Sequence, residues 1–271
     1  MLTKNDDARN KVRSTLLECL EKAGALFKET LFERRVVAKK EELSLVTETD
    51  RRSEELIVQR ILAGFPDHAI LTEESPARGK SPYRWIIDPL DGTTNFFHTY
   101  PVACISIAFE DHGKITLGGV YDPFRGELFY AERGGGATVN GLPLVVSQNP
   151  NLAHSLLATG FPYDRRDHAD EYLAPFKALM LRVQGIRRTG AAALDLVYVA
   201  SGRFDGFWER KLRIWDVAAA SLIVEEAGGK LSDFLGRPLT LSGPDTDEVP
   251  ETAASNGFIH GEMIEVLKNF A

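Results

Sequence analysis

The feature that most constrains this chain is an apolar segment that ends in two acids. Residues 85–87, Trp-Ile-Ile, have the composition of a buried strand, and Asp88 and Asp91 follow with only Pro and Leu between them. Because side chains alternate along a strand, a separation of three indicates that the chain turns here to bring both carboxylates together. Buried carboxylates are costly unless something offsets their charge. The segment therefore predicts a strand that ends beside a source of positive charge.

Two further acids border apolar segments elsewhere in the chain. Glu73 follows a short strand that ends at Leu71, and Asp216 precedes an apolar helical run at 217–224. If these ends converge, four carboxylates meet in one place, and their mutual repulsion is relieved by a cation. Hard oxygen ligands select Mg²⁺, Mn²⁺ or Ca²⁺. The pattern predicts a metal site.

Each acid also has an ordinary explanation when it is taken alone. Asp216 could cap the helix that follows it, Glu73 with its neighbouring Glu could be a solvated pair, and residues 88–92 could form an ordinary turn. None of these explains why acids stand at the ends of three separate apolar elements. The glycine run at 134–136 lacks the Lys-Ser/Thr that completes a P-loop, so it favours a turn between strands over a phosphate cradle.

Hydrophobic periodicity predicts an opening helix, a central run of strands and a mixed second half. Apolar residues at helical spacing predict helices at 8–27, 50–64, 168–183, 191–201, 215–227 and 260–270. Besides 85–87, strands are expected at 34–37, 68–71, 104–109, 114–121, 127–131, 137–146, 155–159, 204–209 and 253–256, and those from 104 to 146 should form an antiparallel meander. The polar stretch 147–151 predicts a boundary between an N-terminal half, residues 1–147, and a C-terminal half, residues 148–271.

Composition narrows the possible partners and location. Lys and Arg number 32 against 39 Asp and Glu, a net charge of −7 that argues against a nucleic-acid partner. Cys19 and Cys104 both stand in apolar segments, which predicts free thiols in a reducing compartment. With no secretory pattern and no apolar run of ~18 residues, we expect a cytoplasmic protein without a membrane span.

Four stretches resemble signatures of the inositol monophosphatase family. In chain order they are Ile87–Phe96 (IDPLDGTTNF), a hairpin at 134–141, a loop at Arg188–Ala193 (RTGAAA), and Trp215–Ala220 (WDVAAA) continuing to 229. The resemblance runs from about Lys39 to Gly229. It departs at Thr72, where a glycine commonly precedes the Glu-Glu pair.

The resemblance implies an α+β fold of layered αβαβα type, shared with fructose-1,6-bisphosphatase and usually dimeric. It implies a phosphoric monoester hydrolase that uses about two or three Mg²⁺ ions per site, with Mn²⁺ as an alternative, and that is often inhibited by lithium. The default substrate is myo-inositol monophosphate. Fructose 1,6-bisphosphate, histidinol phosphate, adenosine 3′,5′-bisphosphate and NADP(H) remain alternatives, as does a regulatory or binding protein that retains the fold without turnover.

The resemblance also implies residue roles, position by position. The metal ligands would be Glu73, Asp88, the Leu90 carbonyl, Asp91 and Asp216. Catalytic roles would fall to Glu73, Thr93 and Asp91, with Glu73 and Thr93 orienting a metal-activated water. Substrate contacts would come from the backbone N–H groups of Gly92 and Thr93 on the phosphate and from Gly190, Ala192 and Glu209 on the alcohol. Lys39 and Asp50 would form an outer shell.

Overall fold

The computed structural model describes residues 4–32, 37–39, 45–241 and 247–271. Its helices are α1 (Lys4–Thr30), α2 (Glu48–Gly64), α3 (Thr93–Phe97), α4 (Ala169–Met180), α5 (Ala192–Ala200), α6 (Ile214–Glu226) and α7 (His260–Leu267), with short 3₁₀ helices at Leu152–His154 and Lys268–Phe270. Its strands are β1 (Val37–Lys39), β2 (Leu45–Thr47), β3 (Ala69–Thr72), β4 (Tyr83–Asp91), β5 (Cys104–Asp111), β6 (Lys114–Asp122), β7 (Glu127–Glu132), β8 (Gly136–Val139), β9 (Leu142–Pro143), β10 (Leu156–Thr159), β11 (Gly185–Arg187), β12 (Gly206–Arg213), β13 (Lys230–Ser232) and β14 (Glu248–Ser255).

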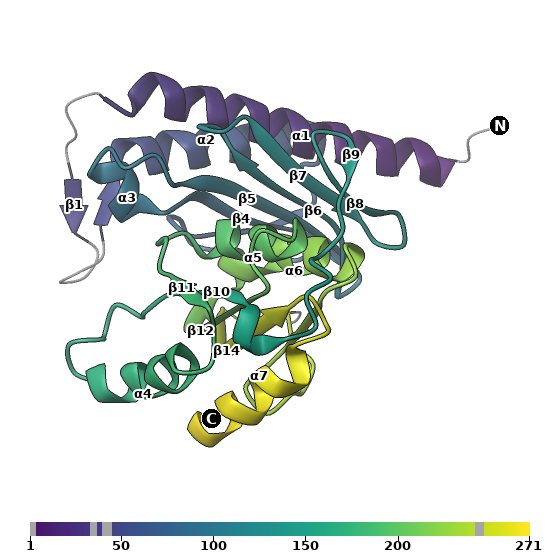
Figure 1. Ribbon diagram of the computed structural model, residues 1–271. Helices are drawn as coiled ribbons and strands as arrows, with labels where there is room; N and C mark the ends of the chain where they lie inside the picture. The colour runs from purple at the N-terminus through teal and green to yellow at the C-terminus, as the bar shows by residue number, and fades with distance from the viewer. Residues whose placement is uncertain (1–3, 33–36, 40–44, 242–246) are drawn as a thin grey trace.

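A seven-stranded sheet of order β3-β4-β5-β6-β7-β8-β9 forms the upper half of the molecule in Figure 1. The expected antiparallel meander is confirmed from β4 to β9, whereas β3 and β4 run parallel. Trp85 and Ile87 of β4 pack with α1 and α2 on the outer face, while Ile86 faces the other way, toward α6. This alternation follows from the period of a strand.

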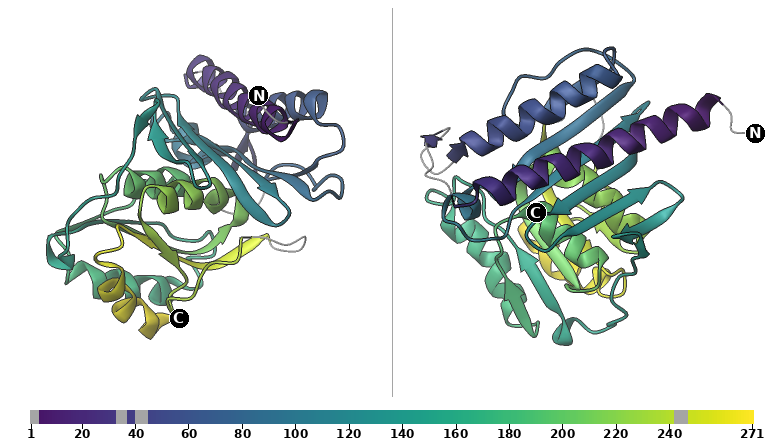
Figure 2. Two further views of the ribbon diagram at one scale, coloured as in Figure 1. Left: turned by 90° about the vertical axis from the view of Figure 1, so that its right-hand side faces the viewer. Right: turned by 90° about the horizontal axis from the view of Figure 1, so that it is seen from above.

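Helices α5 and α6 lie between the two sheets, as the left view in Figure 2 shows in green. Helix α6 is apolar on nearly all sides because it is buried on nearly all sides. It lies directly on the backbone of β6: a Cβ added at Gly118 would stand 2.6 Å from the Ala219 carbonyl oxygen. Glycine in the strand and alanine in the helix are therefore what allow this close approach.

The second sheet has five strands in the order β11-β10-β12-β14-β13. Strand β10 pairs parallel with β11 and β12, and β14 pairs antiparallel with β12 and β13. Helices α4 and α7 cover its outer face (Figure 1) with a small core around Trp208 and Phe234. Helices, sheet, helices, sheet and helices thus follow one another, which confirms the layered α+β fold.

Several expected elements differ in detail. The strand expected at 137–146 is wrong as a single element, because Asn140 (φ +50°) and Gly141 (φ +79°) form a tight turn that separates β8 from β9. The strand expected at 204–209 is β12, which instead begins at Gly206 and continues to Arg213. Strands β2, β11 and β13 are three residues each and were not expected. The strand expected at 34–37 lies outside the described residues except for Val37. The division at residue 147 stays a prediction.

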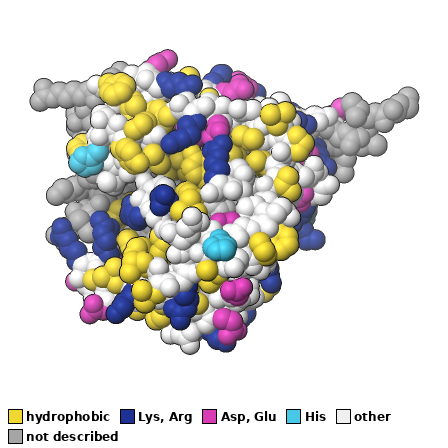
Figure 3. Space-filling model, in the orientation of Figure 1, with side chains coloured by type: hydrophobic (Ala, Val, Ile, Leu, Met, Phe, Trp, Pro, Cys, Tyr) yellow, Lys and Arg dark blue, Asp and Glu magenta, His cyan; other side chains and the backbone are white. Residues whose placement is uncertain are grey.

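No helix among the described residues is both long and apolar enough to cross a membrane. Both cysteines are buried and free, as the sequence predicts. Figure 3 shows one face of the molecule, on which acidic and basic side chains both occur among hydrophobic ones.

Candidate metal-binding active site

A cleft of about 1180 Å³ opens where the ends of several elements meet. Its walls come from the ends of β3 and β4, the start of α3, the segment after β10, the starts of α5 and α6, and the second half of β12. The residues with a predicted site role that line it are Glu73, Asp88, Leu90, Asp91, Gly92, Thr93, Gly190, Ala192, Glu209 and Asp216. Asp50 lies behind this wall, and Lys39 is the last residue of β1.

A β-bulge in β4 aims two carboxylates into the cleft. The pairing of β4 with β5 shifts register between Asp88 and Asp91, so Leu90 joins the core beneath α1 and α2. Without the extra residue, Asp88 and Asp91 would point to opposite faces. The sequence predicted a turn at this place. That prediction is wrong in its geometry, since the strand continues to Asp91, but the expected convergence of the two side chains is present.

Asp91 is held from two directions. Its Oδ2 accepts the backbone N–H of Ala193 at 2.8 Å, in the first turn of α5, and the thiol of Cys104 at 3.6 Å. Burial raises the pKa of Asp91 to about 7, and these hydrogen bonds only partly oppose the rise. Cys104 was not expected at the site; its place opposite Asp91 in β5 follows from a register that the sequence does not reveal.

Asp216 stands inside the first turn of α6 rather than before the helix. Its carboxylate accepts the N–H of Arg213 at 2.7 Å, so it does cap the helix. It also lines the cleft. Asp216 therefore caps the helix and faces the cleft at the same time, and its role as a metal ligand stays a prediction.

The carboxylates of this cleft repel one another. Burial, followed by the charges of Glu73, Asp91 and Asp216, raises the pKa of Asp88 well above its ordinary value. Burial and the charges of Asp91 and Glu73 also raise the pKa of Asp216, although the hydrogen bond from the Arg213 N–H partly offsets this. Four carboxylates and a carbonyl form an all-oxygen donor set, which is the set that a hard divalent cation prefers.

The donor atoms line one cleft, but they do not surround a common point at the distances that a bound ion requires. In the described part of the chain, no three His, Cys, Asp or Glu side chains already stand in an arrangement that holds an ion. An ion entering the cleft would have to draw the carboxylates together. The donor set fits a divalent cation by its chemistry, because the charge of the cation would offset the mutual repulsion of the carboxylates.

Thr93 connects the cleft to Asp50. Its Oγ1 donates toward the Asp50 carboxylate at 3.0 Å and the Leu90 carbonyl at 3.1 Å. Asp50 is fully buried and also accepts the N–H of Thr47 at 2.8 Å. Burial raises the pKa of Asp50 to about 6, against the effect of these hydrogen bonds. Asp50 thus fixes the Thr93 hydroxyl without lining the cleft.

Glycines let the backbone approach on two sides of the cleft. Gly92 has a φ of +94°, and a Cβ there would stand 2.8 Å from the Val102 carbonyl. A Cβ at Gly160 would overlap the carboxylate of Glu209, whose pKa is raised well above its ordinary value by burial and by Asp195. The cleft therefore carries a further acid deep in its wall.

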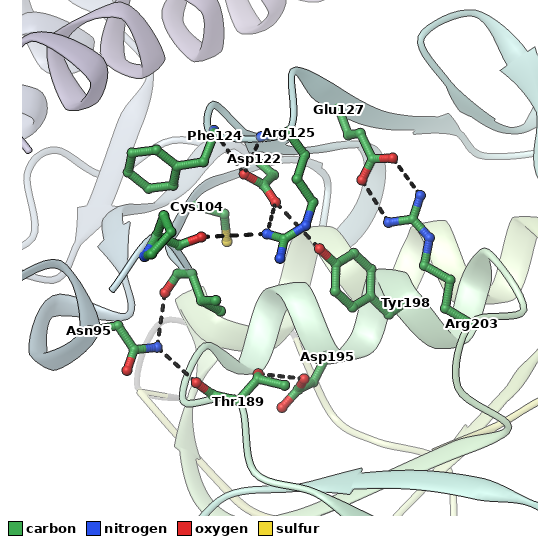
Figure 4. Close-up of polar contacts among 12 residues, drawn as sticks. Asn95, Cys104, Asp122, Phe124, Arg125, Glu127, Thr189, Asp195, Tyr198 and Arg203 are labelled. Carbon is green, nitrogen blue, oxygen red and sulfur yellow. Dashed lines mark hydrogen bonds and ion pairs between the residues drawn. The ribbon is translucent and has the colours of Figure 1, made fainter. Parts of the chain in front are cut away.

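Asp195 is another residue of the site, besides Cys104, that the sequence interpretation missed. It is 1% exposed, lines the cleft, and accepts the Thr189 hydroxyl at 2.6 Å. Asn95 joins the same network by donating to the Thr189 carbonyl at 2.8 Å and to that of Val102 at 2.9 Å (Figure 4). The signal available in the sequence was a single acid inside an otherwise apolar helix, Ala192–Ala200.

The glycine run at 134–136 does not face the cleft. Its Gly134 and Gly136 N–H groups donate to the Glu226 carboxylate at 2.8 and 2.9 Å. The turn interpretation is confirmed, since the run joins β7 to β8. The anion that it binds is a side chain at the end of α6.

Comparison with known proteins places the chain in a family. The model of the inositol monophosphatase family matches residues 8–269. An inositol-1-monophosphatase from Synechocystis is 48% identical over 225 residues, covering 82% of this chain and 76% of that protein. The Nus factor SuhB of Pseudomonas aeruginosa is 48% identical over 206 residues, covering 74% and 76%.

A solved structure agrees in fold as well as in sequence. The extragenic suppressor protein suhB from Bartonella henselae superposes with a TM-score of 0.88 at 40% identity, covering 95% of this chain and 98% of that one. The family model, the curated relatives and the fold all agree with the motifs around Asp88 and Asp216. The chain belongs to the inositol monophosphatase family.

Proposed function

We propose that this protein is a Mg²⁺-dependent phosphatase that hydrolyses a small phosphate monoester, with myo-inositol monophosphate as the first substrate to test. The family to which the chain belongs is one of phosphatases, which carries the reaction class. The observation that supports this chain's own activity is the convergence of Glu73, Asp88, Asp91 and Asp216 on one cleft.

Glu73, Asp88, Asp91 and Asp216, with the Leu90 carbonyl, would hold the Mg²⁺. Bound Mg²⁺ would supply the positive charge that stabilises the phosphoryl oxygens and makes water a better nucleophile. The all-oxygen donor set and the repulsion within it support this assignment. The bulge in β4 is the device that presents two of these ligands on one face.

The chain's own part in the reaction is positioning. The Thr93 proton is directed toward Asp50 and Leu90, so the oxygen of Thr93 keeps lone pairs that accept a hydrogen bond from the attacking water. Glu73 is the second acceptor for that water. The N–H groups of Gly92 and Thr93 at the start of α3 would bind the phosphate.

The alcohol part of the substrate would contact Gly190, Ala192 and Glu209. All three line the same cleft as the carboxylates. Fructose 1,6-bisphosphate, histidinol phosphate, adenosine 3′,5′-bisphosphate and NADP(H) are the competing substrates. The family resemblance also leads us to propose a cytoplasmic homodimer that lithium inhibits.

Phosphate release from these esters, measured as kcat/KM with Mg²⁺ and after EDTA, tests the proposal. We expect the highest value for the inositol ester and loss of all turnover in EDTA, with recovery on adding Mg²⁺ or Mn²⁺. Turnover that persists in EDTA would exclude the metal assignment.

A second candidate function is a regulatory protein that keeps this fold. What favours it is that a relative named a Nus factor is as similar to this chain, at 48% identity, as one named a phosphatase. Protein that binds Mg²⁺ but releases no phosphate from any ester of the panel would support this candidate over the enzyme.

A further inference from the structure

The segment between β10 and α4, residues 160–168, forms one wall of the cleft. Its residues from Gly160 to Arg165 line the same space as the carboxylates. Phe161 fixes the start of the segment, because its ring lies 5.9 Å from that of Phe176 in α4, and Phe176 in turn packs near Trp208 of β12.

Lys211 fastens the middle of this segment to β12. It has a φ of +54°, in the left-handed region that residues with a Cβ rarely adopt. Its Nζ donates to Oδ2 of Asp164 at 2.6 Å, and the Tyr172 hydroxyl of α4 donates to Oδ1 at 2.7 Å. The strained residue is therefore the one whose side chain reaches across to the wall.

Tyr163, next to Asp164, is presented to the cleft by this attachment. The residue is 49% exposed, yet it lines the cleft together with Glu73 and Asp216. Burial of its hydroxyl, followed by the negative charges of Glu73 and Asp216, raises the pKa of Tyr163. A tyrosine phenol is protonated at neutral pH, so the hydroxyl is an O–H donor at the mouth of the site.

We infer that Tyr163 is a specificity residue whose hydroxyl donates a hydrogen bond to a hydroxyl group on the alcohol part of the substrate. The inference deepens the proposed function and rests on it. An uncharged O–H donor suits a neutral polyol hydroxyl, which can accept its hydrogen bond. Tyr163 therefore favours an ester whose alcohol carries hydroxyl groups over an ester that lacks them.

The test compares Tyr163→Phe with wild type on myo-inositol 1-phosphate and on phenyl phosphate, which has no other hydroxyl. Loss of one hydrogen bond should lower kcat/KM for the inositol ester between about threefold and tenfold, and leave phenyl phosphate within about twofold. The matched control is Tyr130→Phe, whose hydroxyl bonds Glu132 away from the cleft and whose loss should change neither ester.

Lys211→Gly tests the attachment separately. Glycine adopts the left-handed backbone without strain, so the variant should keep its melting temperature while losing the bond to Asp164. It should reduce the preference for the inositol ester in the same direction as Tyr163→Phe. Calorimetric titration with myo-inositol in the presence of Mg²⁺ should show the same loss of affinity in Tyr163→Phe, whereas inorganic phosphate should bind unchanged.

Two outcomes would overturn the inference alone: an unchanged ratio between the esters in Tyr163→Phe, or an equal loss on both, which would assign the hydroxyl to the phosphate. A wild-type protein that hydrolyses neither ester would instead overturn the proposed function together with this reading of Tyr163.

Discussion

Two strand-end segments of this protein, the first loop at residues 88–92 and the second loop at 122–126, share the pattern Asp-Pro-x-x-Gly and differ at the third and fourth positions. Residues 88–92 are Asp-Pro-Leu-Asp-Gly at the end of strand β4, and residues 122–126 are Asp-Pro-Phe-Arg-Gly, beginning with the last residue of strand β6. In both, the first carboxylate accepts the N–H two residues on, at 3.0 Å for Asp88 and 2.9 Å for Asp122. In both, the final glycine has a positive φ.

The fourth position decides what each loop can do. Arg125 pairs with the fully buried Asp122 at 2.8 Å, and the Tyr198 hydroxyl donates to the same oxygen at 3.3 Å (Figure 4). The second loop thus carries its own cation. In the first loop Asp91 takes the place of that arginine, so a second negative charge is added where the other loop has a positive one. A loop whose buried acid pairs with an arginine of the same loop has a structural role, whereas a loop with two acids and no cation of its own can hold an ion.

Of the substitutions that test this difference between the loops, Asp91→Asn is expected to have the largest effect on activity. It removes one charge of the donor set, and kcat/KM should fall by on the order of 100-fold or more while the protein stays folded. Steady-state phosphate release and circular dichroism measure the two parts. Asp122→Asn is the matched control in the second loop, and it should retain turnover. Equal losses in both variants would remove the functional distinction between the loops.

The two loops should also differ in how they affect the stability that Mg²⁺ confers on the protein. An ion that binds only the folded state should raise the free energy of unfolding by about 2.7 kcal/mol at 100 times its dissociation constant. Thermal denaturation at several Mg²⁺ concentrations measures this. We expect Asp91→Asn and Asp216→Asn to lose most of the increase and Asp122→Asn to keep it. An increase that survives in Asp216→Asn would place the ion elsewhere.

His260 is a buried side chain that is stable in its uncharged form, in contrast to a carboxylate that binds a cation in its charged form. His260 lies between the Ser232 and Ser255 hydroxyls, each at 2.9 Å, and burial and Lys230 lower its pKa to about 4. The unfolded chain takes up this proton near pH 6.5, so stability is complete above that pH and falls as pH drops toward 4. The loss should be about 2 kcal/mol. Urea unfolding from pH 7 to 4 measures it, and a His260→Asn variant with the same slope would contradict the assignment.

Removing the cation of the second loop should have the smallest effect. Arg125→Met leaves Asp122 buried without its ion pair, but the Arg125 side chain is 44% exposed and its charge is partly screened. We expect a loss of about 1–2 kcal/mol in the free energy of unfolding and no change in kcat/KM. A fall in turnover comparable to that of Asp91→Asn would show that the second loop also serves the site.

The sequence indicated that acids stand at the ends of apolar elements because that pattern is local. Asp88 and Asp91 interrupt an apolar run, and Asp216 opens one, so each stands out without knowledge of the fold. The bulge that turns Asp91 toward Asp88 depends on the pairing of β4 with β5. The register of such a pairing cannot be determined from the sequence of one strand alone. The contact from Cys104 and the buried place of Asp195 depend on the same long-range packing.

The elements that the sequence did not reveal are those too short to carry a period. Strands β2, β11 and β13 are held in extended form by pairing with neighbouring strands. The parallel pairing of β3 with β4 depends on where α2 ends relative to the sheet. By contrast, α1 and α2 have apolar stripes long enough to be recognised, and the meander has a turn after each strand. Length and periodicity separate the two groups.

The close seating of α6 on β6 has a consequence for where harmful substitutions should be sought. Asp216 stands at one end of this helix and Glu226 at the other, about 15 Å along the axis. The Glu226 carboxylate accepts hydrogen bonds from Gly134 and Gly136, and Gly118 lies against Ala219. These contacts fix the position of the helix along its axis. A side chain added at Gly118 would thus displace an active-site carboxylate that it never touches, and a search for inactivating variants confined to the rim of the cleft would overlook it.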